Sequence, residues 1–216
     1  MRYQKKRIYT WSANMAYLVG LISSDGCLSK DGRHIDLTSK DYEQLCNFNK
    51  SLGRDIPIST KPNGRGSLAF RVQFSDTSLY DFLLEAGITP NKSLTMPALN
   101  IPDEFFVDFL RGNFDGDGTT YGFRDKRWKS SFMYYLCFIS ASKEFLIYID
   151  EKIFTHYGVQ HKNITQASGV FKLSYAKKDA SLLAVRMYHS HDVIALSRKR
   201  NKLEGFINGG RGDILT

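Results

Sequence analysis

The apolar pattern of the chain predicts two similar helices, one early in the sequence and one near its middle. The first covers about Ala13 to Asp25, where apolar residues at helical spacing run beside a stripe of small residues, Ala16, Gly20 and Ser24. The second runs from Pro102 to about Asp117. Both contain a glycine in mid-helix and end in an Asp-Gly pair. An internal glycine costs about 1 kcal/mol relative to alanine, so we expect the two helices to pack closely through these positions.

The same order of elements follows each helix. Alternating apolar and polar residues predict strands, Asp31-Gly32 predicts a hairpin turn, and Gly53 and Gly158 end amphipathic helices. The first half is expected to continue with strands at 27–29 and 34–38, a helix capped by Ser39 that ends at 52, strands at 56–61 and 68–74, and a helix at 77–85. The second half is expected to have a strand, turn and strand at 119–140, a helix at 142–156, a hairpin at 160–175, and helices at 179–188 and 196–206.

The chain is therefore an internal repeat of α-β-β-α-β-β-α type. Short segments correspond between the halves, for example Phe70-Arg71-Val72-Gln73-Phe74 and Phe171-Lys172-Leu173-Ser174-Tyr175. The repeat predicts an α+β fold with two halves, residues 1–100 and 101–216. The second half is longer in its first hairpin by about eleven residues, several of them basic.

Composition narrows the class of partner. The 216 residues are 42% hydrophobic, enough for a packed core, and the formal net charge is +8. This charge favours a polyanionic partner, nucleic acid before membrane, although a soluble basic protein without such a partner has the same balance. No apolar run is long enough to span a membrane, and no secretory signal precedes the first helix. We expect an intracellular protein, in the cytoplasm, nucleoid or an organelle matrix.

The two Asp-Gly pairs carry the candidate chemistry. Asp25 and Asp117 fall at the negative ends of their helices, where a carboxylate is disfavoured unless a cation is near. If the helices pack side by side, the carboxylates form a site of hard oxygen ligands suited to Mg²⁺ and to phosphodiester hydrolysis. A single Asp-Gly more often just ends a helix, and the repetition is what favours a metal site. Asp115 has no acidic counterpart at Ser23, so we interpret it as packing or as a cap for a neighbouring backbone.

Basic and polar side chains on the predicted strands suggest a nucleic-acid surface. A two-stranded ribbon fits the major groove of DNA, where such side chains read base edges and bind phosphates. Each of these residues alone is also explained as a solvated surface charge, and only the set is suggestive. The candidates are Arg33, Lys61, Arg65, Arg71, Gln73, Arg124, Lys126, Arg127, Lys162 and Lys172.

The two helix motifs resemble the signature of the LAGLIDADG homing endonucleases, in their single-chain form with two motifs. The residues concerned are Leu18 to Gly26 and Leu110 to Gly118; the second is a close match, whereas Ser23 and Ser24 depart from the pattern in the first. The resemblance covers nearly the whole chain. It implies two pseudo-symmetric αββαββα halves with saddle-shaped antiparallel sheets, packed through two central helices. It also implies cleavage of both strands of a long asymmetric DNA site across the minor groove.

The resemblance further implies roles for individual residues. Two or three divalent ions, Mg²⁺ with Mn²⁺ or Ca²⁺ as substitutes for binding, would be shared by the two aspartates and the backbone carbonyls of Ser24 and Gly116. A basic residue from each half would lie near the cleaved phosphates: Lys92, and either Lys199 or Arg198. Gly20 and Gly112 would lie at the helix interface. The expected protein is a monomer without membrane association.

Three functions compete on this scaffold. A metal-dependent, site-specific double-strand DNA endonuclease, active in intron homing, is favoured because both motif aspartates are present. An RNA maturase that binds its own intron RNA is the alternative. A DNA-binding regulator without catalysis ranks third, because such a protein is expected to have lost an acid.

Overall fold

The repeat predicted from the sequence is present in the structure. The computed structural model describes residues 7–62, 68–124 and 132–209. The first half contains α1 (Ala13–Asp25), β1 (Gly26–Leu28), β2 (His34–Ser39), α2 (Tyr42–Leu52), β3 (Ile58–Pro62), β4 (Leu68–Ser75) and α3 (Thr77–Glu85). Two short 3-10 turns, η1 (Lys92–Leu94) and η2 (Asp103–Phe105), lead into the second half. That half contains α4 (Phe106–Asp117), β5 (Thr119–Arg124), β6 (Phe132–Ser140), α5 (Lys143–Tyr157), β7 (Ile164–Ala167), β8 (Val170–Ala176), α6 (Lys177–Met187) and α7 (Ser197–Gly209).

Each half forms one antiparallel sheet of four strands, and the strand order is the same in both. The orders are β1-β2-β4-β3 and β5-β6-β8-β7. In register, Leu37 lies opposite Val72 in the first sheet and Leu136 opposite Tyr175 in the second, and all four are buried. Alternate residues of the inner strands β2, β4, β6 and β8 thus point toward the core, as the period-two pattern predicted. The α+β fold class with two four-stranded sheets is confirmed.

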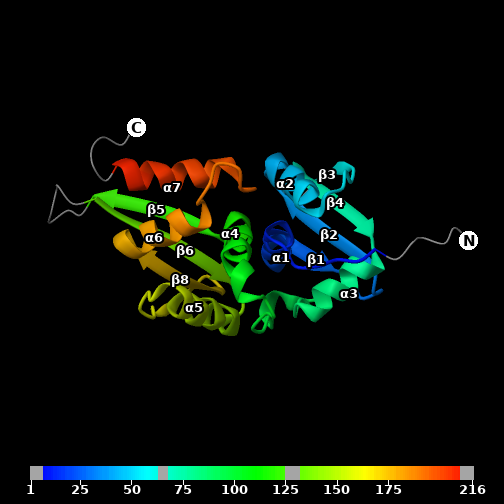
Figure 1. Ribbon diagram of the computed structural model, residues 1–216, viewed down its shortest axis with the longest axis horizontal. Coiled ribbons are helices and arrows are strands. Elements are labelled where there is room, and N and C mark those ends of the chain that lie inside the picture. The colour runs from blue at the N-terminus through cyan, green and yellow to red at the C-terminus, as the bar shows by residue number, and fades with distance from the viewer. Residues whose placement is uncertain (1–6, 63–67, 125–131, 210–216) are drawn as a thin grey trace, which may run out of the picture.

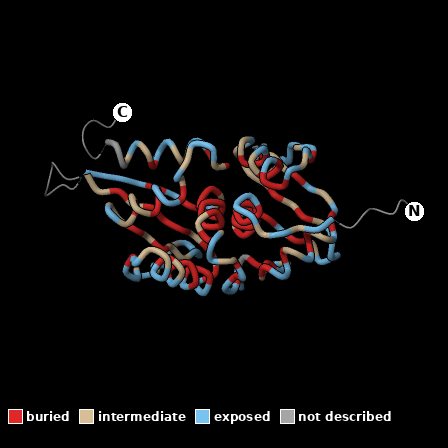
Figure 2. The backbone as a smooth tube through the Cα atoms, in the orientation of Figure 1, coloured by how far each residue is buried: buried red, intermediate tan, exposed pale blue. Residues whose placement is uncertain are grey.

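Helices α1 and α4 lie side by side in the centre of the molecule, and the two sheets flank them on opposite sides (Figure 1). Both helices are buried along most of their length (Figure 2), including every residue from Met15 to Ser23. Helices α5 and α6 pack against the second sheet, and α7 contacts β5. None of the helices in the described ranges is long and apolar enough to cross a membrane.

Polar residues at the helix ends explain where the helices start. Ser12 caps α1, its Oγ accepting from Met15 N at 3.2 Å, and Ser142 caps α5 through Phe145 N at 3.3 Å. Ser39 was expected to cap α2 but does not, because it is the last residue of β2 and pairs with Phe70. Asp41 takes the cap position instead.

Candidate active site at the ends of the two central helices

The two glycines predicted at the helix interface lie where α1 and α4 touch backbone to backbone. A Cβ atom at Gly20 would come within 2.3 Å of the Phe109 carbonyl oxygen, and one at Gly112 within 2.1 Å of the Tyr17 carbonyl oxygen. Both distances are far below van der Waals contact, so no side chain fits at either position. The glycines therefore set the separation of the helices and of everything that their ends carry.

Polar groups fix the register of the two helices. Asn113 Nδ2 of α4 donates to Ser23 Oγ of α1 at 2.9 Å. Asp115 is fully buried and accepts hydrogen bonds from Tyr17 (2.8 Å), Tyr188 (2.6 Å) and the backbone N–H of Leu196 (2.8 Å). Asp115 thus stabilises helix packing and caps a neighbouring backbone, as its asymmetry in the sequence suggested.

The carboxylates of Asp25 and Asp117 converge because their helices end at the same place. A Cβ at Gly116, the residue before Asp117, would lie 3.3 Å from Asp25 Oδ2. Gln44 of α2 donates to the same Asp25 oxygen at 2.6 Å and holds the carboxylate in place. Gln44 is buried and carries no motif signal, so sequence reasoning missed its role.

This convergence makes ionisation of the carboxyl groups harder. Burial, together with the negative charge of Asp117, raises the pKa of Asp25 to about 6, although Gln44 and the two nearby lysines oppose the rise. Burial also raises the pKa of Asp117. Two acids of raised pKa facing each other form a site where a cation would relieve both desolvation and repulsion.

Two lysines lie at the same helix ends and are buried. Lys92 Nζ donates to the Gly26 carbonyl at 2.8 Å, and Lys199 Nζ donates to the carbonyls of Phe114 and Gly116, both at 2.6 Å. Their positive charges offset the negative ends of α1 and α4. Burial lowers the pKa of Lys92, and it lowers that of Lys199 to about 8.

Arg198, the sequence rival of Lys199, points elsewhere. Its guanidinium forms two hydrogen bonds with the Asp41 carboxylate of α2, at 2.9 and 2.6 Å. Ser197 N donates to Glu43, and Asn47 Nδ2 donates to the Ala195 carbonyl at 2.9 Å. The start of α7, in the second half, is therefore attached to α2 of the first half; we call this contact the α2–α7 strap.

The donor set of the site suits a hard divalent cation. The oxygen atoms at these helix ends include the carboxylates of Asp25 and Asp117 and the backbone carbonyl of Gly116, which has a second lone pair beside its bond to Lys199. Within the described ranges, no group of three or more His, Cys, Asp or Glu side chains gathers that could hold a metal. A metal here would be held by two carboxylates, carbonyls and water, the set that Mg²⁺ uses in proteins.

The outer face of the first sheet, the face away from α1, carries several predicted nucleic-acid contacts. On this face Gln73 of β4 lies opposite Asp36 of β2, and Arg71 of β4 lies opposite Thr38 of β2. Arg71 forms an ion pair with Asp36, an acidic residue on this face that sequence reasoning did not consider. Lys61 of β3 is two residues from Ser59, which lies opposite Arg71, so Lys61 is on the same face as Arg71. Arg33 lies in the turn before β2, near Asp31.

The second sheet brings fewer of the predicted basic residues together. Lys172 lies on the outer face, with its Nζ 5.2 Å from the centre of the Tyr121 ring. Arg124 alternates with Tyr121 on β5 and therefore points to the other side of the strand. Lys162 forms an ion pair with Asp179 of α6 at 2.8 Å, on the helix side of the sheet. The remaining candidates, Arg65, Lys126 and Arg127, lie outside the described residues.

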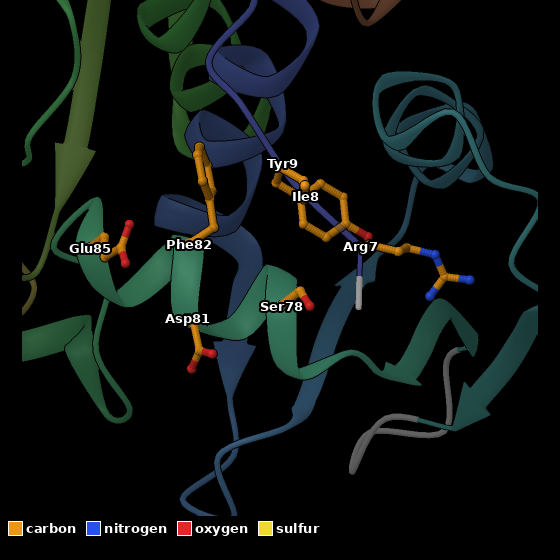
Figure 3. A pocket seen from close by; sticks show the side chains of 7 residues that line it. All are labelled: Arg7, Ile8, Tyr9, Ser78, Asp81, Phe82 and Glu85. Atoms are coloured by element: carbon orange, nitrogen blue, oxygen red, sulfur yellow. The ribbon is translucent and has the colours of Figure 1, made fainter. Parts of the chain in front are cut away.

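A cavity of about 380 Å³ lies apart from the carboxylate pair, between the N-terminal segment and α3. Figure 3 shows Arg7, Ile8 and Tyr9 on one side of it and side chains of α3 on the other. Arg7 bonds to Asp76, the cap of α3, at 3.2 Å, and Tyr9 bonds to the same carboxylate at 2.9 Å. These bonds attach the N-terminal segment to the start of α3.

Solved structures share this architecture at low sequence identity. No protein-family model matches the chain, and no curated protein sequence matches it. The homing endonuclease I-WcaI bound to its DNA recognition sequence matches with a TM-score of 0.60 and 12% identity, over 89% of this chain and 88% of that one. An I-DmoI variant in complex with its target DNA in the presence of Mg matches with a TM-score of 0.52 and 17% identity, over 83% and 97%.

Full-length DUF199/WhiA from Thermatoga maritima also matches, with a TM-score of 0.58 and 16% identity, over 97% of this chain. This chain spans 65% of the length of that protein. The N-terminal domain of DUF199/WhiA, which matches as well, is described as a LAGLIDADG domain. Identities this low show a common fold, with two halves that each hold a four-stranded sheet.

Proposed function

We propose that this chain, which has the two-half fold of the LAGLIDADG homing endonucleases, is a metal-dependent endonuclease that cleaves both strands of a long, asymmetric DNA site. The observation that carries the proposal is the convergence of Asp25 and Asp117, with raised pKa values, at the ends of two helices in backbone contact. Such a pair destabilises the fold at neutral pH, which is typical of a functional site.

The residues that would hold divalent ions are Asp25, Asp117 and the carbonyls of Ser24 and Gly116. When bound between two carboxylates, such ions lower the pKa of an attacking water and stabilise charge on the leaving oxygen. The protein fixes the carboxylates: Gln44 orients Asp25, and the contact at Gly20 and Gly112 sets the separation of the two helix ends. Because each half of the chain contributes one acid, the pair is suited to a single site that cleaves both strands of the DNA.

Lys92 and Lys199 supply positive charge beside the carboxylates. Each half of the chain contributes one lysine, and each lysine donates to carbonyl oxygen at the end of a central helix, Lys92 to Gly26 and Lys199 to Phe114 and Gly116. We assign them the stabilisation of negative charge on the cleaved phosphates. We assign Arg198, which bonds to Asp41, the positioning of α7 instead.

The outer faces of the two sheets would contact the duplex on either side of the site. β1 starts directly after Asp25 and β5 starts two residues after Asp117, so both faces extend away from the carboxylates in opposite halves of the molecule. The two faces differ in sequence, which favours an asymmetric target, and both halves belong to one chain, which favours a monomer.

The test is the selection of cleaved sites from a randomised duplex library in Mg²⁺. A selected site should be cut on both strands by the wild-type chain. Asp117→Asn and Asp25→Asn should each lower cleavage at least a thousandfold and leave binding of the site within about threefold. Asp103→Asn, an exposed acid remote from the site, is the matched control and should cleave like the wild type.

Cleavage that persists in Asp117→Asn would refute the role of the carboxylate pair. If the chain binds a duplex but does not cut it in Mg²⁺, it is a DNA-binding protein on this scaffold. Tight binding to an intron RNA with no cut site in flanking DNA would instead support the maturase alternative.

A further inference from the structure

The outer face of the second sheet carries a cluster of aromatic side chains on β5 and β6, although it occupies the position proposed to face DNA. Tyr121 and Phe123 of β5 and Tyr135 of β6 lie on this side, as their register shows. Met133 and Ile139 of β6 alternate onto the same side. Tyr121 is 37% exposed and Phe123 is 47% exposed, so these rings belong to the surface.

The three rings form an ordered stack. The centres of Tyr121 and Tyr135 are 4.9 Å apart with an angle of 16° between the planes, and Phe123 and Tyr135 are 6.3 Å apart at the same angle. Lys172 Nζ lies 5.2 Å from the centre of Tyr121. Stacked rings present their edges outward: Phe123 is wholly apolar, the hydroxyls of Tyr121 and Tyr135 add polar groups, and Lys172 places one positive charge at the side.

The first sheet provides an internal comparison. Its outer face has Asp36, Arg71 and Gln73 at the cross-strand positions, and these side chains donate and accept hydrogen bonds. The two halves have the same strand order, but the aromatic stack on this face is found in the second sheet and polar side chains take its place in the first. A common structural need of the fold does not explain the difference, and the aromatic stack is therefore a property of the second half.

We infer that the aromatic face of the second sheet recognises the C5-methyl groups of thymine in one half of the DNA site. The inference rests on the proposed function. In the major groove, thymine is the base that adds a methyl group to its polar edge, and apolar side chains contact this group. Guanine and cytosine present mainly donors and acceptors there, which would be desolvated without a partner against Phe123, the one ring of the stack that has no polar atom. The apolar part of the face thus favours thymine over a G·C pair.

The position of the stack predicts where these thymines lie. Tyr121 and Phe123 come four and six residues after Asp117 along an extended strand. At about 3.3 Å per residue this is roughly 13 to 20 Å from the carboxylate. Since DNA base pairs are about 3.4 Å apart, the thymines are expected about four to six base pairs from the centre of cleavage.

The experiment uses the Asp117→Asn variant of this 216-residue chain and duplexes selected by binding from a randomised library. Selected sites should be enriched in thymine on one side of the centre. Replacing those thymines with deoxyuridine removes only the methyl groups, and should weaken binding about fourfold for each buried methyl. The same replacement on the other side should change binding less than twofold. Since only the DNA is altered, the test does not depend on the folding of a further variant.

Matched substitutions assign the effect to the sheet. Phe123→Ser should reduce the preference for thymine over deoxyuridine, whereas Lys61→Ser on the first sheet should weaken binding of both duplexes equally. Equal affinity for thymine and deoxyuridine duplexes, or sites without thymine on one side, would overturn the inference while leaving the endonuclease proposal intact. If the chain selects no duplex at all, the proposed function fails and the inference fails with it.

Discussion

Replacing Asp25 with asparagine should stabilise the metal-free protein at neutral pH. The carboxylate of Asp25 is held near Asp117 in a partly buried site, and its pKa rises from 3.8 to about 6. Asparagine has nearly the same shape and can keep a hydrogen bond to Gln44, but it carries no charge. The substitution therefore removes the desolvation and repulsion of a carboxylate while changing little else in the packing.

The magnitude follows from proton linkage. The pKa of Asp25 is higher in the folded chain than in the unfolded chain, so proton binding favours the fold. This stabilisation is complete below the unfolded pKa of about 4 and is lost as the pH rises through about 6. At about 1.4 kcal/mol for each pKa unit, the full loss is about 3 kcal/mol, an upper value because the group is partly exposed.

The assay is urea unfolding of wild type and Asp25→Asn in EDTA between pH 4.5 and about 8. The free energy of unfolding of the variant relative to the wild type should increase with pH across this range and level off above about pH 7. Asp103→Asn is the control. Because its bond to Lys152 lowers the pKa of Asp103, that carboxyl is already ionised throughout the range.

A difference that is flat or falls with pH would refute the reasoning, since it would mean that Asp25 is not strained by burial and by Asp117. A second measurement separates strain from metal binding. Adding Mg²⁺ should raise the stability of the wild type at pH 7.5 and should have little effect on Asp25→Asn, because a ligand stabilises only the state that binds it.

Three other expectations can be checked in the same way. Gly20→Ala and Gly112→Ala should each destabilise the fold by several kcal/mol in urea unfolding, because the new Cβ would overlap a backbone carbonyl. The control is Gly205→Ala in α7, where the new Cβ meets open space; it should be neutral or stabilising by up to about 1 kcal/mol. Lys199→Met should lower the cleavage rate at least a hundredfold with little loss of DNA binding, and Arg198→Ala should lower it less; equal losses would contradict the assignment of Lys199. Asp76→Ala should destabilise the fold by about 1 kcal/mol or more through loss of the α3 cap. Burial would raise the pKa of Asp76, but bonds from Leu79, Tyr9 and the nearby arginines hold that pKa below its usual value. The stability that the ionised carboxylate contributes is therefore present above about pH 4 and lost below it. Destabilisation by Asp76→Ala that is larger in acid than at pH 7 would contradict this account.

The central features of the fold could be predicted from the sequence because their causes are local. Gly20, Gly112 and the two Asp-Gly pairs are visible as repeated patterns, and the alternating strands follow from the period of two. The contact of Arg198 with Asp41, by contrast, joins residues 157 positions apart, and no pattern in the sequence marks it. The same holds for Gln44, whose bond to Asp25 depends on how α2 packs.

The sides of the strands were predicted less well, for two different reasons. The side of Arg124 could not be predicted from the sequence, because the apolar Tyr121 and Phe123 alternate onto the outer side and only the structure shows that Thr120, on the side of Arg124, is buried. Lys162 precedes its strand, and its position depends on Asp179 of α6, a tertiary contact. Basic residues were counted as a set, and the aromatic residues between them, which dominate the outer face of the second sheet, were not considered.

The α2–α7 strap has a consequence for protein engineering. The halves of this chain look like interchangeable modules, since each has its own sheet and contributes one acid and one lysine. Lys199, however, is placed by a helix whose start is bonded to Asp41 and Glu43 of the other half. A chimera that recombines residues 101–216 with a foreign first half must therefore carry the two acidic residues of α2 as well. Otherwise the α2–α7 strap would be lost and Lys199 would be misplaced.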